Sequence, residues 1–220
     1  MRVTRRDLFA DRAEAGARLA ARLAGMAWSD PVVLGLARGG VPVAAVVAAA
    51  LDAPLDVAVA RKIGIPGQPE FGVGAVTAGG PPHYDGHTLA ALGLTPDDLR
   101  ADCERERAEA RRRLQRYRQD RTPVPLAGRD VLLVDDGLAT GVTARAALGE
   151  LRTAAPARLV FAAPVCARES RDALRAAADA DDVVCVSAPA EFGAVGLWYR
   201  SFGQTSDKDV LAALAEGTRA

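Results

Sequence analysis

Several kinds of residue are scarce in this sequence of 220 amino acids, and each scarcity argues against a class of structure. Aromatic residues make up 5% of the chain, so the hydrophobic core must be built mainly from Ala, Val and Leu. The two histidines and three cysteines form no CxxC or Cys/His cluster, which argues against a zinc site. The cysteines are odd in number and far apart, which argues against a disulfide framework and suits a reducing compartment.

Long apolar runs and an excess of one charge are also absent. No stretch reaches the roughly 18 uninterrupted apolar residues of a membrane span, and the amino-terminal residues lack the apolar run of a signal peptide. We therefore expect a cytoplasmic protein with no membrane partner. Basic and acidic residues number 28 each, so the total charge predicts no nucleic-acid partner, and any charged function must be local.

The chain does contain an alternation of short apolar runs with helical patterns. The apolar runs predict strands at 31–36, 55–60, 131–134, 159–163 and 183–186. The helical patterns predict helices at 11–24, 43–51, 143–151, 168–178 and 207–216. Continuous apolar strands between helices are typical of a parallel sheet covered on both faces. We expect one three-layer α/β/α domain over residues 1–220, with a mainly parallel central sheet.

One segment departs from this rhythm and is expected to form an inserted arm at about 82–121. The turn residues at 79–82, Gly-Gly-Pro-Pro, favour a hairpin from about 72 to 88. Thr95, followed by proline and two acids, favours the start of a long helix that runs to about Arg118. This helix has a thin apolar stripe and is otherwise charged, so we expect it to project from the body or to lie over it.

Acidic and hydroxyl residues follow the strand at 131–134. Asp135 and Asp136 end this strand, and a turn with two threonines around Gly141 opens the next helix. Backbone N–H groups at a helix start, with two hydroxyls, form a cradle for a phosphate. The carboxylates would repel phosphate but suit ribose hydroxyls or a magnesium-bound ligand. Because ligands of open α/β sheets bind at the carboxyl ends of strands, the pattern predicts one site for a phosphate and a diol.

The run from Val131 to Thr143 resembles the phosphoribosyl-diphosphate signature of type I phosphoribosyltransferases: an apolar strand, two acids, three residues and Thr-Gly-x-Thr. Neither a Walker loop nor a dinucleotide fingerprint is present. The resemblance implies that the protein binds 5-phosphoribosyl-1-diphosphate (PRPP) with Mg²⁺. It would transfer the phosphoribosyl group to a nitrogen acceptor and release pyrophosphate. Asp135 and Asp136 would hold the ribose hydroxyls, with a metal contact through water as an alternative. The 5′-phosphate would bind to Ala139, Thr140, Gly141, Val142 and Thr143.

The resemblance also assigns a pyrophosphate site. In this family the loop after the first core strand binds pyrophosphate through backbone amides, often with a non-proline cis peptide bond. Here that loop is Ala37-Arg38-Gly39-Gly40, in which Arg38 could add a guanidinium. Lys62 lies at the end of the second strand, where similar enzymes have a basic residue that contacts the pyrophosphate. A charged residue at a solvated strand end is an equally good explanation of Lys62. Residues 63–76 resemble the flexible catalytic loop of the family, and an ordinary surface turn has the same composition.

The arm and the tail resemble those of poorly characterised bacterial phosphoribosyltransferases. In the wider family a segment called the hood covers the acceptor and sets its specificity. Residues 189–220 are expected to fill that place, with Phe192, Trp198 and Tyr199 as candidates to stack on an acceptor. Packing of these aromatic residues onto the sheet is an equally good explanation. Relatives often form homodimers, and the sequence does not reveal the acceptor.

Two other functions remain open at this stage. The first is a non-catalytic sensor that binds the same sugar diphosphate, which acceptor-dependent release of pyrophosphate would distinguish from an enzyme. The second is a nucleic-acid-binding protein that uses the basic run at 111–113 with Arg116, Arg118 and Arg121. The acids that interleave with this run favour a solvated helix face held by i,i+4 pairs, and the balanced total charge weighs against nucleic acid.

Overall fold

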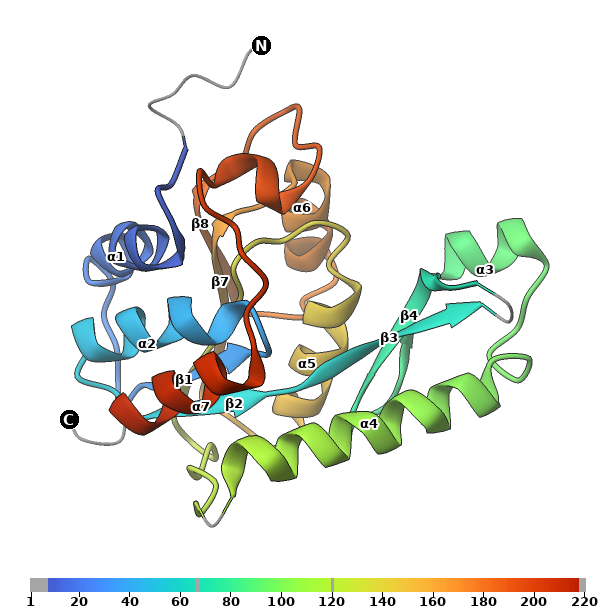
Figure 1. The fold of residues 1–220 in the computed structure, drawn as a ribbon, viewed down its shortest axis with the longest axis horizontal. Coiled ribbons are helices and arrows are strands. Elements are labelled where there is room, and N and C mark those ends of the chain that lie inside the picture. Colours follow the sequence, from blue (N-terminus) through green and yellow to red (C-terminus); the bar gives the residue numbers. More distant parts are fainter. Residues whose placement is uncertain (1–7, 66–67, 120, 218–220) are drawn as a thin grey trace.

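The computed structural model describes residues 8–65, 68–119 and 121–217 and contains a five-stranded parallel sheet (Figure 1). The strand order is β2-β1-β6-β7-β8, and every predicted core strand is present. These strands are β1 (Val32–Leu36), β2 (Leu55–Ala58), β6 (Asp130–Val134), β7 (Arg158–Val165) and β8 (Asp182–Ser187). The order places β1 beside β6, so the loops that follow these two strands are neighbours at the carboxyl edge.

Helices cover both faces of the sheet, which confirms the three-layer prediction. The helices are α1 (Arg12–Leu23), α2 (Gly40–Ala50) and α7 (Asp207–Glu216) on one face, and α5 (Val142–Arg152) and α6 (Arg168–Ala176) on the other. Successive strand residues point to opposite faces. Val33 and Leu132 therefore pack beneath the first set, while Leu34 and Leu133 pack beneath the second.

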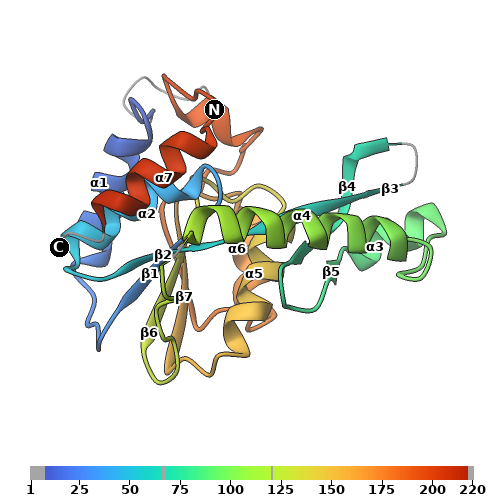
Figure 2. The same ribbon diagram turned by 60° about the horizontal axis from the view of Figure 1, so that its bottom comes forward.

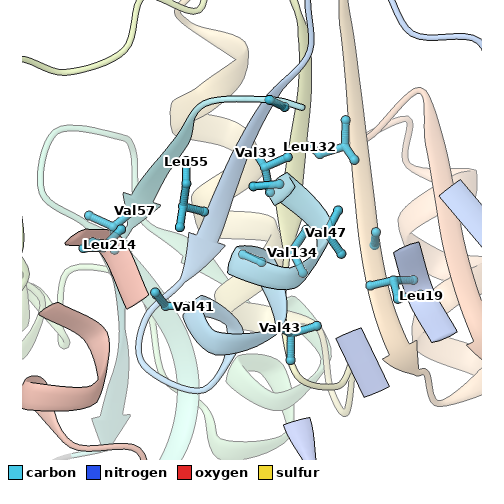
Figure 3. Packing of buried hydrophobic residues seen from close by; sticks show 14 of the residues in the cluster. Leu19, Val33, Val41, Val43, Val47, Leu55, Val57, Leu132, Val134 and Leu214 are labelled. Carbon is cyan, nitrogen blue, oxygen red and sulfur yellow. The ribbon is translucent and has the colours of Figure 1, made fainter. Parts of the chain in front are cut away.

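The core is aliphatic, as the shortage of aromatic residues predicts. Figure 3 shows Leu19 of α1, Val47 of α2 and Leu214 of α7 packed over the sheet residues Val33 and Leu132. Small side chains let α2 lie very close to β1, because a Cβ at Gly35 would stand 2.6 Å from the Cα of Val41. This close approach fixes the loop between β1 and α2, which forms part of the candidate site.

An arm projects from the sheet and is larger than predicted (Figures 1 and 2). Its elements are β3 (Ala60–Ile65), β4 (Gln68–Thr77), β5 (His83–Tyr84), α3 (Gly86–Leu92) and α4 (Arg100–Arg118). The turn at 79–82 joins β4 to β5, as expected, but the described parts of 63–76 form an antiparallel ladder. A Cβ at Gly74 would stand 2.7 Å from Tyr84, so this glycine allows β5 to pack closely and is no sign of flexibility.

The long helix of the arm begins later than its sequence suggests. Thr95 and Asp98 close a turn of their own, in which the Thr95 N–H donates to the Asp98 carboxylate at 2.8 Å. The regular helix α4 then starts at Arg100. Its buried residues, Cys103 and Tyr117 among them, belong to the predicted thin apolar stripe.

The basic residues of α4 bind protein groups. Arg111 donates to the carbonyl of Ala78 at 2.9 Å, and Arg118 lies 3.1 Å from the buried Asp56 carboxylate. Glu109 accepts hydrogen bonds from Arg112 and Arg113, which hold its pKa at about 2. The contacts of Arg111 and Arg118 attach the helix to the hairpin and the sheet. The pairs of Glu109 lie within the helix, at spacings of i,i+3 and i,i+4. Within the described ranges, no helix has the length and hydropathy to cross a membrane.

The expectation that the cysteines remain unpaired is wrong for two of them. Cys166 and Cys185 form a disulfide with a Cα–Cα distance of 6.2 Å, and Cys103 remains free and buried. Strands β7 and β8 are parallel neighbours, and their register sets Ala163 against Cys185. Cysteines 19 positions apart in the chain thus meet at the same edge of the sheet. Sequence spacing cannot reveal such a pairing because it depends on strand register.

Candidate functional site

The loops after β1 and β6 touch each other at the carboxyl edge of the sheet. The Asp136 carboxylate lies so close to Gly39 that a Cβ at this glycine would overlap it. A Cβ at Gly40 would likewise overlap the carbonyl of Val134. Both positions therefore require glycine, and the acid pair and the Gly-Gly loop form one continuous surface.

The loop at 37–40 has an open, positively charged end. Its Ala37–Arg38 peptide bond is cis, as the resemblance to the family led us to expect. The Ala37 N–H donates to the carbonyl of Ala58 at 2.8 Å. Gly39 caps α2 without any side-chain hydrogen bond. In the first turn the Val41 N–H donates to the Arg38 carbonyl at 3.2 Å, and Pro42 has no N–H. The Arg38 side chain is one-third exposed, and its guanidinium lies 3.8 Å from Asp207.

The two carboxyl groups lie side by side and are held by neighbouring groups. Asp135 Oδ1 accepts the backbone N–H of Asp136 at 2.8 Å. Asp136 Oδ2 accepts from Nε of Arg12 at 2.9 Å. The two side chains also hydrogen-bond to each other, so the acids form one connected pair at the carboxyl edge of the sheet.

Burial controls the charge of this acid pair. Burial raises the pKa of Asp135 well above its usual range, and the negative charge of Asp136 raises it further. Burial also raises the pKa of Asp136, whereas the Arg12 guanidinium opposes that increase. Arg12 therefore helps to keep Asp136 ionised, and an ionised carboxylate accepts hydrogen bonds from hydroxyl groups.

The raised pKa of Asp135 predicts that Asp135→Asn stabilises the ligand-free protein at neutral pH. An acid with a raised pKa in the folded state makes the protein less stable as pH rises from the ordinary value of 3.8 through the folded value. Asparagine does not titrate, so the variant escapes this loss. We expect its Tm advantage to grow as the pH rises above 3.8, by about 2–4 °C for each kcal/mol. Asp182→Asn serves as the surface control, and an advantage that is absent or independent of pH would contradict this explanation.

The turn between β6 and α5 lies at the same edge and leads into a helix start without a side-chain cap. Gly141 caps α5 in the left-handed conformation, with a φ of 78°, and no side chain caps the helix start. Hydrogen bonds from β7 and α6 fix this loop. Leu138 N donates to the Val165 carbonyl at 2.8 Å, and the Ser170 hydroxyl donates to the Ala139 carbonyl. A fixed helix start with free N–H groups is a ready anion site.

The predicted acceptor residues lie mainly in the core. Trp198 and Tyr199 are 5% and 6% exposed, and Phe192 is partly buried beside them. The Trp198 indole donates to the Phe192 carbonyl at 3.0 Å, and the Tyr199 hydroxyl donates to the backbone carbonyl of Asp136 at 2.6 Å. Tyr199 therefore supports the acid pair from behind. Phe202 is the aromatic side chain of this tail that is exposed, and it is not among the residues predicted to stack on an acceptor.

A cavity of about 530 Å³ joins the site to the tail. Arg38 and Gly39 line one part, Asp136 and Arg12 another, and residues 202–205 a third. Lys62 does not line this cavity; it is exposed on β3, next to Arg61, which pairs with Glu106 on α4. Arg12 was missed because it lies 124 positions from Asp136 in the chain, and no local pattern marks it.

Comparison with known proteins agrees with this geometry. A family model described as "Phosphoribosyl transferase domain" matches residues 8–199. The chain belongs to the phosphoribosyltransferase family. It is 44% identical to the crystal structure of TT1426 from Thermus thermophilus, over 95% of this chain and 98% of that one, with a TM-score of 0.79. It is also 44% identical over 212 residues to "Putative phosphoribosyl transferase Rv0571c" of Mycobacterium tuberculosis. The chain spans 47% of that relative, or about half the length of the curated proteins it matches.

Proposed function

We propose that this chain binds PRPP with magnesium, transfers its phosphoribosyl group to a nitrogen acceptor and releases pyrophosphate. The observation that carries the proposal is the acid pair Asp135 and Asp136 at the carboxyl edge of the sheet, beside the uncapped start of α5. Two carboxylate oxygens match the two hydroxyls of a ribose, and a helix start matches its terminal phosphate. The open loop with Arg38 then suits the diphosphate.

Each part of the sugar diphosphate has its own group of residues in this proposal. Asp135 and Asp136 accept hydrogen bonds from the ribose hydroxyls. Arg38 is the better-supported cation for the diphosphate, because Lys62 lies outside the cavity. The 5′-phosphate binds to Ala139, Thr140, Gly141, Val142 and Thr143, and the diphosphate binds to Ala37, Arg38, Gly39 and Gly40.

The acid pair also fits a magnesium ion held together with the substrate. Magnesium prefers oxygen ligands, and proteins commonly hold it through one or two carboxylates and the phosphates of a substrate. No cluster of three or more metal-binding side chains occurs among the residues that the structure describes, so those residues alone form no complete cage. Asp135 and Asp136 could contact the ion through water. When bound, the ion would supply positive charge to the departing diphosphate.

Catalysis in this proposal depends on position and charge, without a protein nucleophile. The acid pair and the α5 cradle fix the sugar at both ends, so that the acceptor can approach the anomeric carbon opposite the departing group. Arg38 and the backbone of the loop at 37–40 stabilise the negative charge that develops on the diphosphate. Tyr199 holds the backbone of Asp136 in place through its 2.6 Å hydrogen bond.

Pyrophosphate release tests the proposal against a sensor of the same ligand. The protein would be incubated with PRPP, magnesium and a set of nitrogen heterocycles, and pyrophosphate would be measured by a coupled assay. We expect release that depends on one acceptor. Calorimetric binding of PRPP with no acceptor-dependent release would favour the sensor, and absence of PRPP binding would contradict both.

Thr140→Val is expected to weaken PRPP binding by roughly 10- to 100-fold. The substitution removes one hydroxyl donor to the 5′-phosphate, and a hydrogen bond to a charged group contributes about 1.5–3 kcal/mol. Isothermal calorimetry measures the change directly. Thr153→Val, at the opposite end of α5, removes a hydroxyl that donates to the Glu150 carbonyl and should leave PRPP affinity unchanged. Equal affinities for both variants would contradict the phosphate assignment.

A further inference from the structure

Asp207 connects the arm to the loop at 37–40. It is the first residue of α7, and its side chain is 23% exposed. Its Oδ1 accepts the Tyr117 hydroxyl at 2.6 Å, and its Oδ2 lies 2.9 Å from Nη1 of Arg116. Both of these donors belong to α4, so the arm helix holds the carboxylate. Arg38 is a third group near it, with Nη1 3.8 Å from the same Oδ1.

The charge of Asp207 acts on Arg38. The hydrogen bond from Tyr117 lowers the pKa of Asp207, and the charges of Arg116 and Arg38 lower it further against the effect of burial. The carboxylate is therefore ionised at neutral pH, and it attracts any guanidinium nearby. Arg38 is also the cation assigned to the diphosphate. Asp207 and the diphosphate are thus two anions that attract the same side chain.

The distances show how firmly Asp207 holds each of its neighbours. The Tyr117 and Arg116 contacts have hydrogen-bond lengths, whereas 3.8 Å is too long for a hydrogen bond from Arg38. Tyr117 is 1% exposed and packs in the core beneath α2 and α7, which fixes the position of its hydroxyl. This hydroxyl therefore occupies the carboxylate oxygen that lies closest to Arg38.

We propose that Asp207 is an internal competitor of the diphosphate for Arg38, and that Tyr117 of the arm limits this competition by occupying Oδ1. This inference rests on the proposed function. With the hydroxyl in place, Asp207 acts on Arg38 through charge alone, and Arg38 stays at the cavity wall, one-third exposed. Without the hydroxyl, Oδ1 would lose its donor, and Arg38 would need to move by only about 1 Å to replace it. The arm would thus set how readily Arg38 binds a diphosphate.

Calorimetric titration with magnesium pyrophosphate tests the competition, because this probe requires neither an acceptor nor turnover. Tyr117→Phe keeps the ring and removes the hydroxyl. It should lower the affinity about 3- to 10-fold, since Arg38 must first break a hydrogen bond to Asp207. Asp207→Asn should raise the affinity about 2- to 5-fold, because it removes the competing charge. This gain should shrink at high salt, which screens partly exposed charges.

The double variant distinguishes competition from a purely structural role of Tyr117. If Asp207 captures Arg38 in Tyr117→Phe, then adding Asp207→Asn should restore the affinity at least to that of the unaltered protein. Tyr84→Phe is the matched control, because it removes an arm hydroxyl that interacts with Cys103 and should leave the affinity unchanged. Three results would overturn the inference: a double variant as weak as Tyr117→Phe, a lower affinity in Asp207→Asn, or an equal loss in Tyr84→Phe.

A crystal structure of Tyr117→Phe without ligand keeps the inference separate from the proposed function. If the unaltered protein binds neither PRPP nor magnesium pyrophosphate, the proposed function fails. The structure of the variant still decides whether Tyr117 keeps Arg38 away from Asp207. We expect Arg38 to donate to Asp207 Oδ1 at about 2.9 Å in the variant. A separation that stays near 3.8 Å would overturn the inference whatever the ligand does.

Discussion

Asp135→Asn combined with Asp136→Asn is expected to lower PRPP affinity roughly 100-fold or more while the protein stays folded. Each substitution replaces a carboxylate oxygen that accepts from a ribose hydroxyl, and each such charged hydrogen bond contributes about 1.5–3 kcal/mol. The double variant also loses the ion pair with Arg12. Calorimetric titration with PRPP and magnesium measures the loss.

The control for this experiment is Asp182→Asn, which removes a carboxylate from the surface of β8. Asp182 lies 3.5 Å from Arg175 and does not line the cavity. It should bind PRPP like the unaltered protein, and the circular dichroism of all three proteins should match. Undiminished affinity in the double variant would disprove the assignment of the ribose site.

Gly39→Ala is expected to lower PRPP affinity by roughly 10- to 100-fold, because overpacking commonly costs about 1–3 kcal/mol. The added methyl group would overlap the Asp136 carboxylate. Either this carboxylate moves away from Arg12, or the start of α2 moves away from the site. Both movements separate the acid pair from the loop that would bind the diphosphate.

Gly149→Ala is the matched control for this change. It lies within α5, where an added Cβ meets nothing within 4 Å. Alanine in an exposed helix position should raise stability by about 0.5–1 kcal/mol and leave the site unchanged. Thermal unfolding should therefore show a higher stability for Gly149→Ala, and PRPP titration should show an unchanged affinity. Gly39→Ala should instead show a lower PRPP affinity. Equal PRPP affinity in Gly39→Ala and Gly149→Ala would contradict the proposed role of the contact between the two loops in PRPP binding.

Features encoded by neighbouring residues could be predicted from the sequence. The strand at 131–134, the acid pair and the turn into α5 occupy one short stretch, so their order and spacing define the local structure. The final helix was predicted at 207–216 and is observed over the same residues, because Ser206 and Asp209 form a capping box that marks its start.

Features that depend on contacts between distant segments could not be predicted. Arg12 reaches Asp136 because α1 packs against the sheet, and the Cys166–Cys185 disulfide depends on the register of β7 and β8. Residues 63–76 resemble the family's flexible catalytic loop, or an ordinary surface turn, in their composition. Their described parts instead form the β3–β4 ladder, in which Gly74 packs closely against Tyr84. Composition alone does not distinguish a glycine that permits motion from one that permits contact.

A crystal structure of the protein with PRPP and magnesium tests the central claim most directly. We expect the 5′-phosphate to lie at the N–H groups that open α5. We also expect the ribose hydroxyls to donate to the carboxylates of Asp135 and Asp136. A sugar diphosphate bound elsewhere, or bound here with both carboxylates unengaged, would contradict the account.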